Sequence, residues 1–215
     1  MSRRAAAGRP EATSHADIES AAFVLFAERG FEGTTLDHIA SAVGVTRRTL
    51  FRYYASKNDI PWGQFDRTLE DFRGLLEAQP AELPLAHAIG RGVVAFNDFP
   101  PDAVPSHAVR MRLILETPAL QAHSSLKYAE WRGVVATYAA ARLGQDPDDL
   151  RPVLLGHAAL GIALSSYESW LRSGEDDAAS LLTTLRQAVA AMAEVFGRDA
   201  EPPAPTRGVR GDRRR

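Results

Sequence analysis

Apolar residues recur three and four positions apart along most of the chain, and this is the spacing of one face of an α-helix. No stretch alternates apolar and polar residues for long enough to indicate a β-strand, and no Asn-Gly or Asp-Gly turn joins two apolar runs. Prolines and glycines divide the pattern into about nine segments. The pattern therefore predicts an all-α fold of about nine helices.

The first three predicted helices are short and follow one another closely. Each begins at a hydroxyl residue that can accept a hydrogen bond from the first turn, namely Ser14, Thr35 and Thr46. Gly30 and Gly44 stand where the first and second helices should end. Two short helices, a tight glycine turn and a third helix are the arrangement of a helix-turn-helix unit. The expected bounds are about 14–29, 35–43 and 46–54.

Longer helices should follow this unit. Ser56 and Asp59 form a capping pair that opens a fourth helix, expected from about Lys57 to Glu77, with Pro61 tolerated in its first turn. The last two helices repeat apolar residues at helical spacing, which fits either a surface for a second subunit or the core of the protein itself. The helices after the fourth are expected at about 84–97, 102–116, 118–143, 148–172 and 177–196.

The third helix carries three arginines among six residues, Arg47, Arg48 and Arg52. Leu50 and Tyr54 share the face that can pack on the preceding helices, so Arg48 and Arg52 should point away from it. Arginine can form two parallel hydrogen bonds with a guanine, and polar groups at helix ends can hold phosphates. A basic face can also be merely solvated, but its place after two short helices favours DNA binding. The predicted DNA contacts are Thr34, Thr35, Thr46, Arg47, Arg48, Thr49, Arg52, Tyr53 and Lys57.

Five stretches between residues 14 and 60 match the pattern of a known family: Phe26–Leu36, Ile39-Ala40, Val43–Val45, Thr49–Tyr54 and Ser56-Lys57. Over residues 14–60 the sequence resembles the TetR family of transcriptional regulators. The family often has Tyr in place of Phe51 and His in place of Tyr53. Because Phe51 has no hydroxyl to donate to a phosphate, we assign that contact to Tyr53.

The resemblance implies a homodimer, held by its last two helices, that represses transcription from a double-stranded, near-palindromic operator. It also implies a small-molecule effector that binds the second domain and, by moving the fourth helix, changes the spacing of the two DNA-binding heads. Residues 56–63, 110–116 and 118–124 resemble the mycofactocin-system branch of this family in particular. That likeness implies a regulator of redox-cofactor biosynthesis genes and a long-chain acyl thioester as effector.

Aromatic and polar side chains in the second domain are the candidates for the effector site. Small-molecule sites have apolar walls with a few polar groups, and Arg110 and Arg112 could hold an anionic end. Two plainer interpretations stay open: the aromatic residues fill an ordinary core, and Arg112 pairs with Glu116 one turn later. The predicted ligand-binding residues are Trp62, Phe65, Arg110, Arg112, Leu115, His123, Tyr128 and Trp131.

Charge is distributed unevenly along the 215 residues, whose formal net charge is −2. Residues 1–55 sum to +1, residues 56–197 to −6 and residues 198–215 to +3, so a polyanion would be attracted to the first and last segments. We expect a DNA-binding domain at 14–55, a ligand-binding and dimerisation domain at 56–197, and disordered tails at 1–13 and 198–215.

Composition argues against several other classes of protein. The chain has no cysteine, which excludes disulfides and thiolate metal sites. It has no Gly-x-Ser-x-Gly, His-Glu-x-x-His or phosphate-binding glycine motif, so we expect neither enzyme activity nor a cofactor or metal. Without a signal peptide or an apolar run of about 20 residues, we expect a cytoplasmic protein with no membrane partner. The alternatives to a ligand-released repressor are an activator without a ligand and a helical protein-interaction module whose basic head binds an acidic partner.

Overall fold

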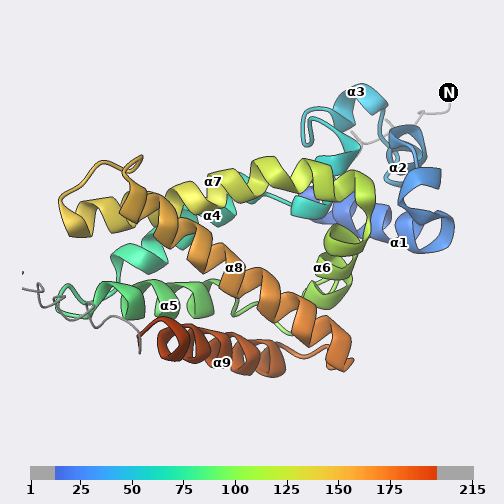
Figure 1. Ribbon diagram of the computed structural model, residues 1–215. Helices are drawn as coiled ribbons and strands as arrows, with labels where there is room; N and C mark the ends of the chain where they lie inside the picture. Colours follow the sequence, from blue (N-terminus) through green and yellow to red (C-terminus); the bar gives the residue numbers. More distant parts are fainter. Residues whose placement is uncertain (1–12, 198–215) are drawn as a thin grey trace, which may run out of the picture.

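The computed structural model describes residues 13–197, and the two predicted terminal tails lie almost wholly outside this range. Within it the chain forms nine α-helices and one 3₁₀ helix and no strand, which confirms the all-α prediction (Figure 1). None of the described helices is long and apolar enough to cross a membrane. The elements are α1 (His15–Gly33), α2 (Leu36–Ala42), α3 (Arg47–Leu50), η1 (Lys57–Trp62), α4 (Phe65–Glu77), α5 (Leu85–Phe96), α6 (His107–Glu116), α7 (Pro118–Leu143), α8 (Leu150–Ser173) and α9 (Ala178–Gly197).

The start and stop signals of the first helices act as the sequence predicts. The hydroxyls of Ser14, Thr35 and Thr46 each accept a hydrogen bond from the backbone N–H three residues later. Gly30 (φ 74°) and Gly44 (φ 70°) take the left-handed backbone conformation that ends a helix most easily at glycine. After Gly30 the chain makes one more helical turn, so α1 continues across a kink to Gly33.

The third helix is shorter than predicted. It covers only Arg47–Leu50, and the chain then tightens into a turn instead of remaining α-helical to Tyr54. The amide N–H of Arg52 and that of Tyr53 bond carbonyls three residues back, at 3.1 and 3.0 Å. The Tyr53 and Tyr54 rings pack edge-on against His15 of α1, with ring centres 4.9 and 5.3 Å away.

The predicted fourth helix is also broken. Residues Lys57–Trp62 form the 3₁₀ helix η1, and α4 begins only at Phe65. In an α-helix that began at Lys57, the missing N–H of Pro61 would leave the Lys57 carbonyl without its partner. Gly63 (φ 61°) then turns the chain before α4. The turn at Gly63 therefore separates η1 from the helix that lines the interior of the second domain.

Figure 1 shows α1, α2 and α3 gathered at one end of the molecule, with α8 and α9 side by side away from them. The head formed by α1–α3 has its own apolar core, which includes Ile18, Ile39 and Leu50. Ile60 of η1 and Leu120 of α7 are fully buried in the same cluster. The second domain therefore contributes side chains to the core of the head, and the two parts are packed together.

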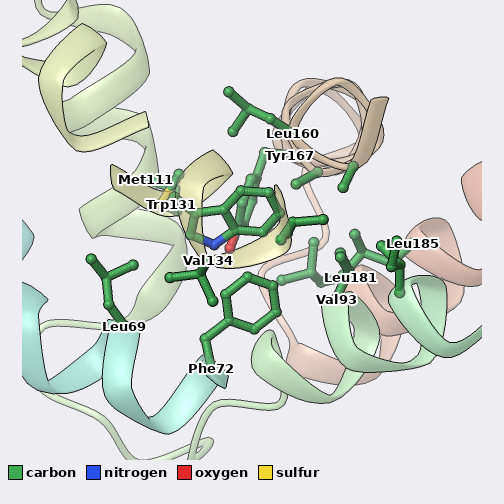
Figure 2. Packing of buried hydrophobic residues seen from close by; sticks show 14 of the residues in the cluster. Leu69, Phe72, Val93, Met111, Trp131, Val134, Leu160, Tyr167, Leu181 and Leu185 are labelled. Carbon is green, nitrogen blue, oxygen red and sulfur yellow. The ribbon is translucent and has the colours of Figure 1, made fainter. Parts of the chain in front are cut away.

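The core of the second domain lies between α4, α5, α6, α7, α8 and α9 (Figure 2). The Trp131 ring stacks on Phe72, with 4.8 Å between the ring centres. Leu181 and Leu185 of α9, whose spacing also fitted a subunit interface, are fully buried in this core. Gly156 of α8 lets α7 approach closely, because a Cβ there would lie 2.9 Å from the Arg132 carbonyl oxygen. The core thus fixes the helices that surround the cavity described below.

Candidate functional site

The three arginines of the third helix project from the head into solvent. The side chains of Arg47, Arg48 and Arg52 are exposed. Arg47 lies 3.5 Å from Asp37 of α2 and above the Phe51 ring, but this ion pair is open to water. Within the described part of the chain, neither Arg48 nor Arg52 makes an ion pair. Two guanidinium groups are therefore available to an external partner.

Three threonines surround this arginine face. Thr35 and Thr46 are exposed at the first turns of α2 and α3, and their hydroxyls accept backbone N–H groups. The hydroxyls of Thr46 and Thr49 also share a hydrogen bond of 3.0 Å. Positively polarised helix ends beside exposed arginines can bind phosphate groups. The contacts that Thr35, Thr46 and Thr49 make with DNA stay a prediction.

Thr34 does not belong to this surface, contrary to the sequence prediction. It is 1% exposed, and its hydroxyl donates to the carbonyls of Leu25 at 3.1 Å and Gly30 at 2.9 Å. These bonds connect Thr34 with carbonyls before and at the kink of α1, inside the head. Thr34 is therefore a structural residue, and it has no surface to offer a phosphate.

Tyr53 and Lys57, both predicted to contact phosphates, are engaged inside the protein. The Tyr53 hydroxyl donates to the Thr13 carbonyl at 2.5 Å. The Lys57 ammonium donates to the carbonyls of Phe31 at 2.7 Å and Thr34 at 2.9 Å, and lies above the Phe31 ring. These polar atoms hold segments of the head in place, and the phosphate contacts of Tyr53 and Lys57 stay a prediction.

A cavity of about 490 Å³ lies in the second domain between η1, α4, α6, α7 and α8. Five of the predicted ligand-binding residues line it: Trp62, Phe65, Arg110, Tyr128 and Trp131. The remaining wall is mainly apolar, and the indole N–H of Trp62 is buried without a hydrogen-bond partner. The apolar wall residues that the sequence prediction did not include are chiefly Phe96, Phe99, Met111, Ile114, Leu160, Ala163 and Leu164. The polar ones are Glu19, Gln64, Arg67, Thr68, Asp71, Asn97, His107 and Tyr167.

The other three predicted ligand-binding residues lie outside this cavity. Arg112 and Leu115 line a separate hollow of about 420 Å³, and Arg112 pairs with Glu116 at 3.2 Å. His123 contacts the Asp59 carboxylate at 3.0 Å. Burial opposes ionisation of Asp59, but the hydrogen bond from Ser56 and the charge of His123 outweigh it and hold its pKa below the usual value. His123 therefore helps to fix η1 against α7.

A polar cluster that the site prediction missed lies at the inner wall of the cavity. His107 Nε2 is 2.9 Å from the Tyr167 hydroxyl, which donates to the Asn97 side-chain oxygen. The Asn97 amide donates to the Val93 carbonyl at 2.7 Å. Burial, with a smaller effect of the Arg110 charge, lowers the pKa of His107 to about 3, so this ring is neutral at pH 7. The cluster therefore carries no formal charge at pH 7 and presents neutral hydrogen-bonding groups at the cavity wall.

Arg110 connects the cavity wall to the head. Its guanidinium pairs with Glu19 of α1 at 2.5 Å and donates to the Pro61 carbonyl at 2.7 Å. The other Glu19 oxygen accepts the Tyr54 hydroxyl at 2.7 Å. Burial and these contacts with Glu19 raise the pKa of Tyr54. A single cluster of polar side chains thus touches the cavity, the connector η1 and Tyr54, which follows the turn after α3.

Two family descriptions match the sequence, and together they cover most of the chain. "Bacterial regulatory proteins, tetR family" matches residues 18–60, which include the head. "MftR C-terminal domain" matches residues 83–197, which include α5 to α9.

The sequence is also similar to two bacterial regulators along most of their length. It is 43% identical to the candidate mycofactocin biosynthesis transcriptional regulator MftR of Mycobacterium tuberculosis, over 86% of this chain and 92% of that protein. It is 37% identical to the HTH-type transcriptional regulator TcmR of Streptomyces glaucescens, over 72% of each chain.

Solved structures share the fold at much lower sequence identity. The SmeT–triclosan complex has a TM-score of 0.58 at 17% identity, covering 91% of this chain and 98% of that one. The fatty acid degradation regulator FadR of Bacillus halodurans has a TM-score of 0.54 at 16% identity, covering 82% and 98%.

Proposed function

The chain belongs to the TetR family of bacterial transcriptional regulators, and on this basis we propose that it is a repressor released from DNA by a small molecule. The observation that carries the proposal is the position of the cavity. Its wall includes Trp62 of η1, the following residue Gly63, and Arg110, which is paired with Glu19 of the head. A ligand in this cavity therefore contacts residues that also hold the DNA-binding head.

The third helix is proposed to enter the major groove of the operator. Arg48 and Arg52 are exposed and carry no carboxylate partner in the described chain, so each can approach a base edge or a phosphate. In a dimer with twofold symmetry, two such helices would read half-sites about 34–36 Å apart on a near-palindromic operator. Thr35, Thr46, Arg47 and Thr49 are proposed to complete this surface.

The dimer is proposed to form through α8 and α9. Leu150 and Leu154 of α8 are 80% and 61% exposed, and apolar side chains this open commonly mark a surface that another subunit covers. Gly161 lies on the same helix with open space beside it, so a second helix could approach closely. On α9 the other half would come from its exposed residues, Thr183, Arg186, Gln187, Ala190, Ala191, Ala193 and Glu194.

The effector is proposed to be a largely apolar molecule with a polar or anionic end, such as a long-chain acyl thioester. The apolar wall supports a chain of this kind, since each buried methylene contributes about 0.8 kcal/mol to binding. The regulated genes are proposed to be those of mycofactocin biosynthesis. The similarity to the Mycobacterium tuberculosis protein supports this choice of genes.

The proposal is tested by titrating a mobility-shift assay with acyl thioesters of increasing chain length, using DNA from upstream of the protein's own gene. Trp62 and Trp131 line the cavity, so tryptophan fluorescence reports binding independently. We expect a specific shift, affinity that rises with chain length, and loss of the shift at saturating ligand. Specific DNA binding that no thioester weakens would contradict the ligand-released repressor.

A further inference from the structure

Glu19 lies where the head and the cavity meet. Its side chain is 12% exposed and lines the cavity, although the residue belongs to α1. One carboxylate oxygen pairs with Arg110 and the other accepts the Tyr54 hydroxyl. The charge of Arg110 therefore stabilises a nearly buried carboxylate that also holds the last residue of the turn after α3.

Arg110 has capacity for another partner. The bonds to Glu19 and to the Pro61 carbonyl use two of the five N–H donors of a guanidinium. The space around the pair is nevertheless tight, since a Cβ on Gly63 would lie 3.3 Å from Glu19 and 3.5 Å from Arg110. A second anion at Arg110 would thus be close to the Glu19 carboxylate, and two carboxylates sharing one cation repel each other.

Building on the proposed function, we propose that the effector must carry an anionic end that forms an ion pair with Arg110 in place of Glu19. Without this partner, Glu19 no longer holds the Tyr54 hydroxyl, and the head is released. Apolar contacts supply affinity, whereas the exchange at Arg110 supplies the signal. A ligand with the same chain and no charge would fill the cavity without weakening operator binding, because it has no preference between the two states of the head.

The exchange predicts that ligand charge and release of DNA go together. Decanoate and 1-decanol have the same chain length and differ in charge. We expect decanoate to bind the free wild-type protein at least about fivefold more tightly than the protein–operator complex, since coupled binding is reciprocal. Decanol should bind both forms equally. Tryptophan fluorescence gives each dissociation constant, and the anisotropy of labelled operator gives the release.

Glu19→Gln separates affinity from signalling. It removes the carboxylate that competes for Arg110 and keeps an oxygen that can accept the Tyr54 hydroxyl. Decanoate should therefore bind the free variant roughly tenfold more tightly than it binds wild type, because the like charge is gone. Decanoate should bind the complex of the variant with the operator as tightly as it binds the free variant. The variant should therefore bind decanoate more tightly than wild type does and release the operator less.

Tyr54→Phe tests the same connection from the side of the head. The variant keeps the ring that packs on His15 and loses only the hydroxyl that reaches Glu19. Decanoate should bind free Tyr54→Phe as it binds wild type. Because the variant already lacks the bond through which Glu19 holds the head, it should bind the operator more weakly than wild type without ligand, and decanoate should weaken that binding no further. Thermal unfolding and circular dichroism verify that both variants keep a folded head.

Two control variants distinguish the exchange from a general effect of charge. Asp71→Asn removes a carboxylate from the cavity wall that has no described contact with the head, so it should raise decanoate affinity and keep the wild-type release. Glu116→Gln breaks the exposed pair with Arg112 on the same helix, outside this cavity, and should change neither quantity.

The outcomes also separate this inference from the proposed function. If decanol releases the operator as well as decanoate does, or if Glu19→Gln keeps the wild-type response, the exchange at Arg110 is wrong. If acyl thioesters release the wild-type protein from the operator and decanoate does not, the exchange at Arg110 is also wrong. The proposed function as a ligand-released repressor is then still supported. If neither thioesters nor decanoate release the wild-type protein, both proposals fail.

Discussion

The ammonium nitrogen of Lys57 lies 2.7 Å from the carbonyl oxygen of Phe31 and 4.2 Å from the centre of the Phe31 ring. The same ammonium also donates to the Thr34 carbonyl. Carbonyls at the end of a helix have no partner within the helix, and a cation is favoured there. Lys57 therefore joins the connector η1 to the end of α1, which keeps the orientation of the head fixed.

Lys57→Ala is expected to destabilise the head. Hydrogen bonds that involve a charged group contribute about 1.5–3 kcal/mol each. The two bonds share one ammonium that is only partly buried, so their contributions do not add in full, and a loss of roughly 2 kcal/mol in the free energy of unfolding is expected. Because both bonds are internal, the salt dependence of operator binding should keep the wild-type slope. If Lys57 instead bound a phosphate directly, its removal would reduce that slope by about one in each subunit, or about two in a dimer.

Arg48→Ala is expected to reduce operator discrimination without unfolding the protein. The side chain is exposed and makes no ion pair within the described residues, so stability should change little. A bidentate contact with guanine contributes about 1–3 kcal/mol of discrimination, and a dimer has two such contacts. Competition between operator and random DNA measures this directly. An unchanged preference for the operator would show that Arg48 reads no base.

Local features of the fold were predictable because their causes lie within a few residues. The caps at Ser14, Thr35 and Thr46 each bond a backbone group three residues away, so sequence spacing alone reveals them. The break before α4 also has local causes. Pro61 lacks the N–H that an α-helix from Lys57 would need, and Gly63 turns the chain two residues later.

The roles of the polar site residues were less predictable, because their partners are distant in the chain. Lys57 bonds a carbonyl 26 positions away, and His107 contacts a tyrosine 60 positions away. Periodicity identifies the apolar faces, and five of the eight predicted ligand-binding residues do line one cavity. It gives no information on which polar group each arginine or lysine meets once the helices are packed.

Ala163→Phe is expected to prevent ligand binding by filling the cavity. Ala163 is buried on α8 and lines the wall, so a phenyl ring there would occupy space proposed for the ligand. Overpacking of this kind costs about 1–3 kcal/mol of stability, and operator binding without ligand should persist. Titration with acyl thioesters should then leave both the fluorescence and the DNA complex unchanged. Wild-type release from this variant would place the effector elsewhere.

Leu154→Glu is expected to convert the proposed dimer into a monomer. Leu154 is 61% exposed in the single chain, so a carboxylate there should not disturb the fold. In a dimer through α8 the same carboxylate would be buried without a partner, at a considerable free-energy cost. Sedimentation equilibrium measures the change in mass, and circular dichroism verifies the fold. The control Leu126→Glu changes a leucine that is 64% exposed on α7 and should leave the mass unchanged.

His107→Gln is expected to make the protein less sensitive to acid. Burial lowers the pKa of His107 from 6.5 to about 3, so between these values the unfolded chain takes up a proton that the folded protein does not. Wild type should therefore lose stability as the pH falls from about 6, by up to about 1.4 kcal/mol per pH unit from this group alone. Glutamine can keep a hydrogen bond with Tyr167 and does not titrate. Urea denaturation at pH 6 and pH 4 measures the free energy of unfolding of both proteins. Between these pH values it should fall more for wild type than for the variant. If both proteins lost the same amount of stability, the His107 ring would not be held neutral in the folded protein.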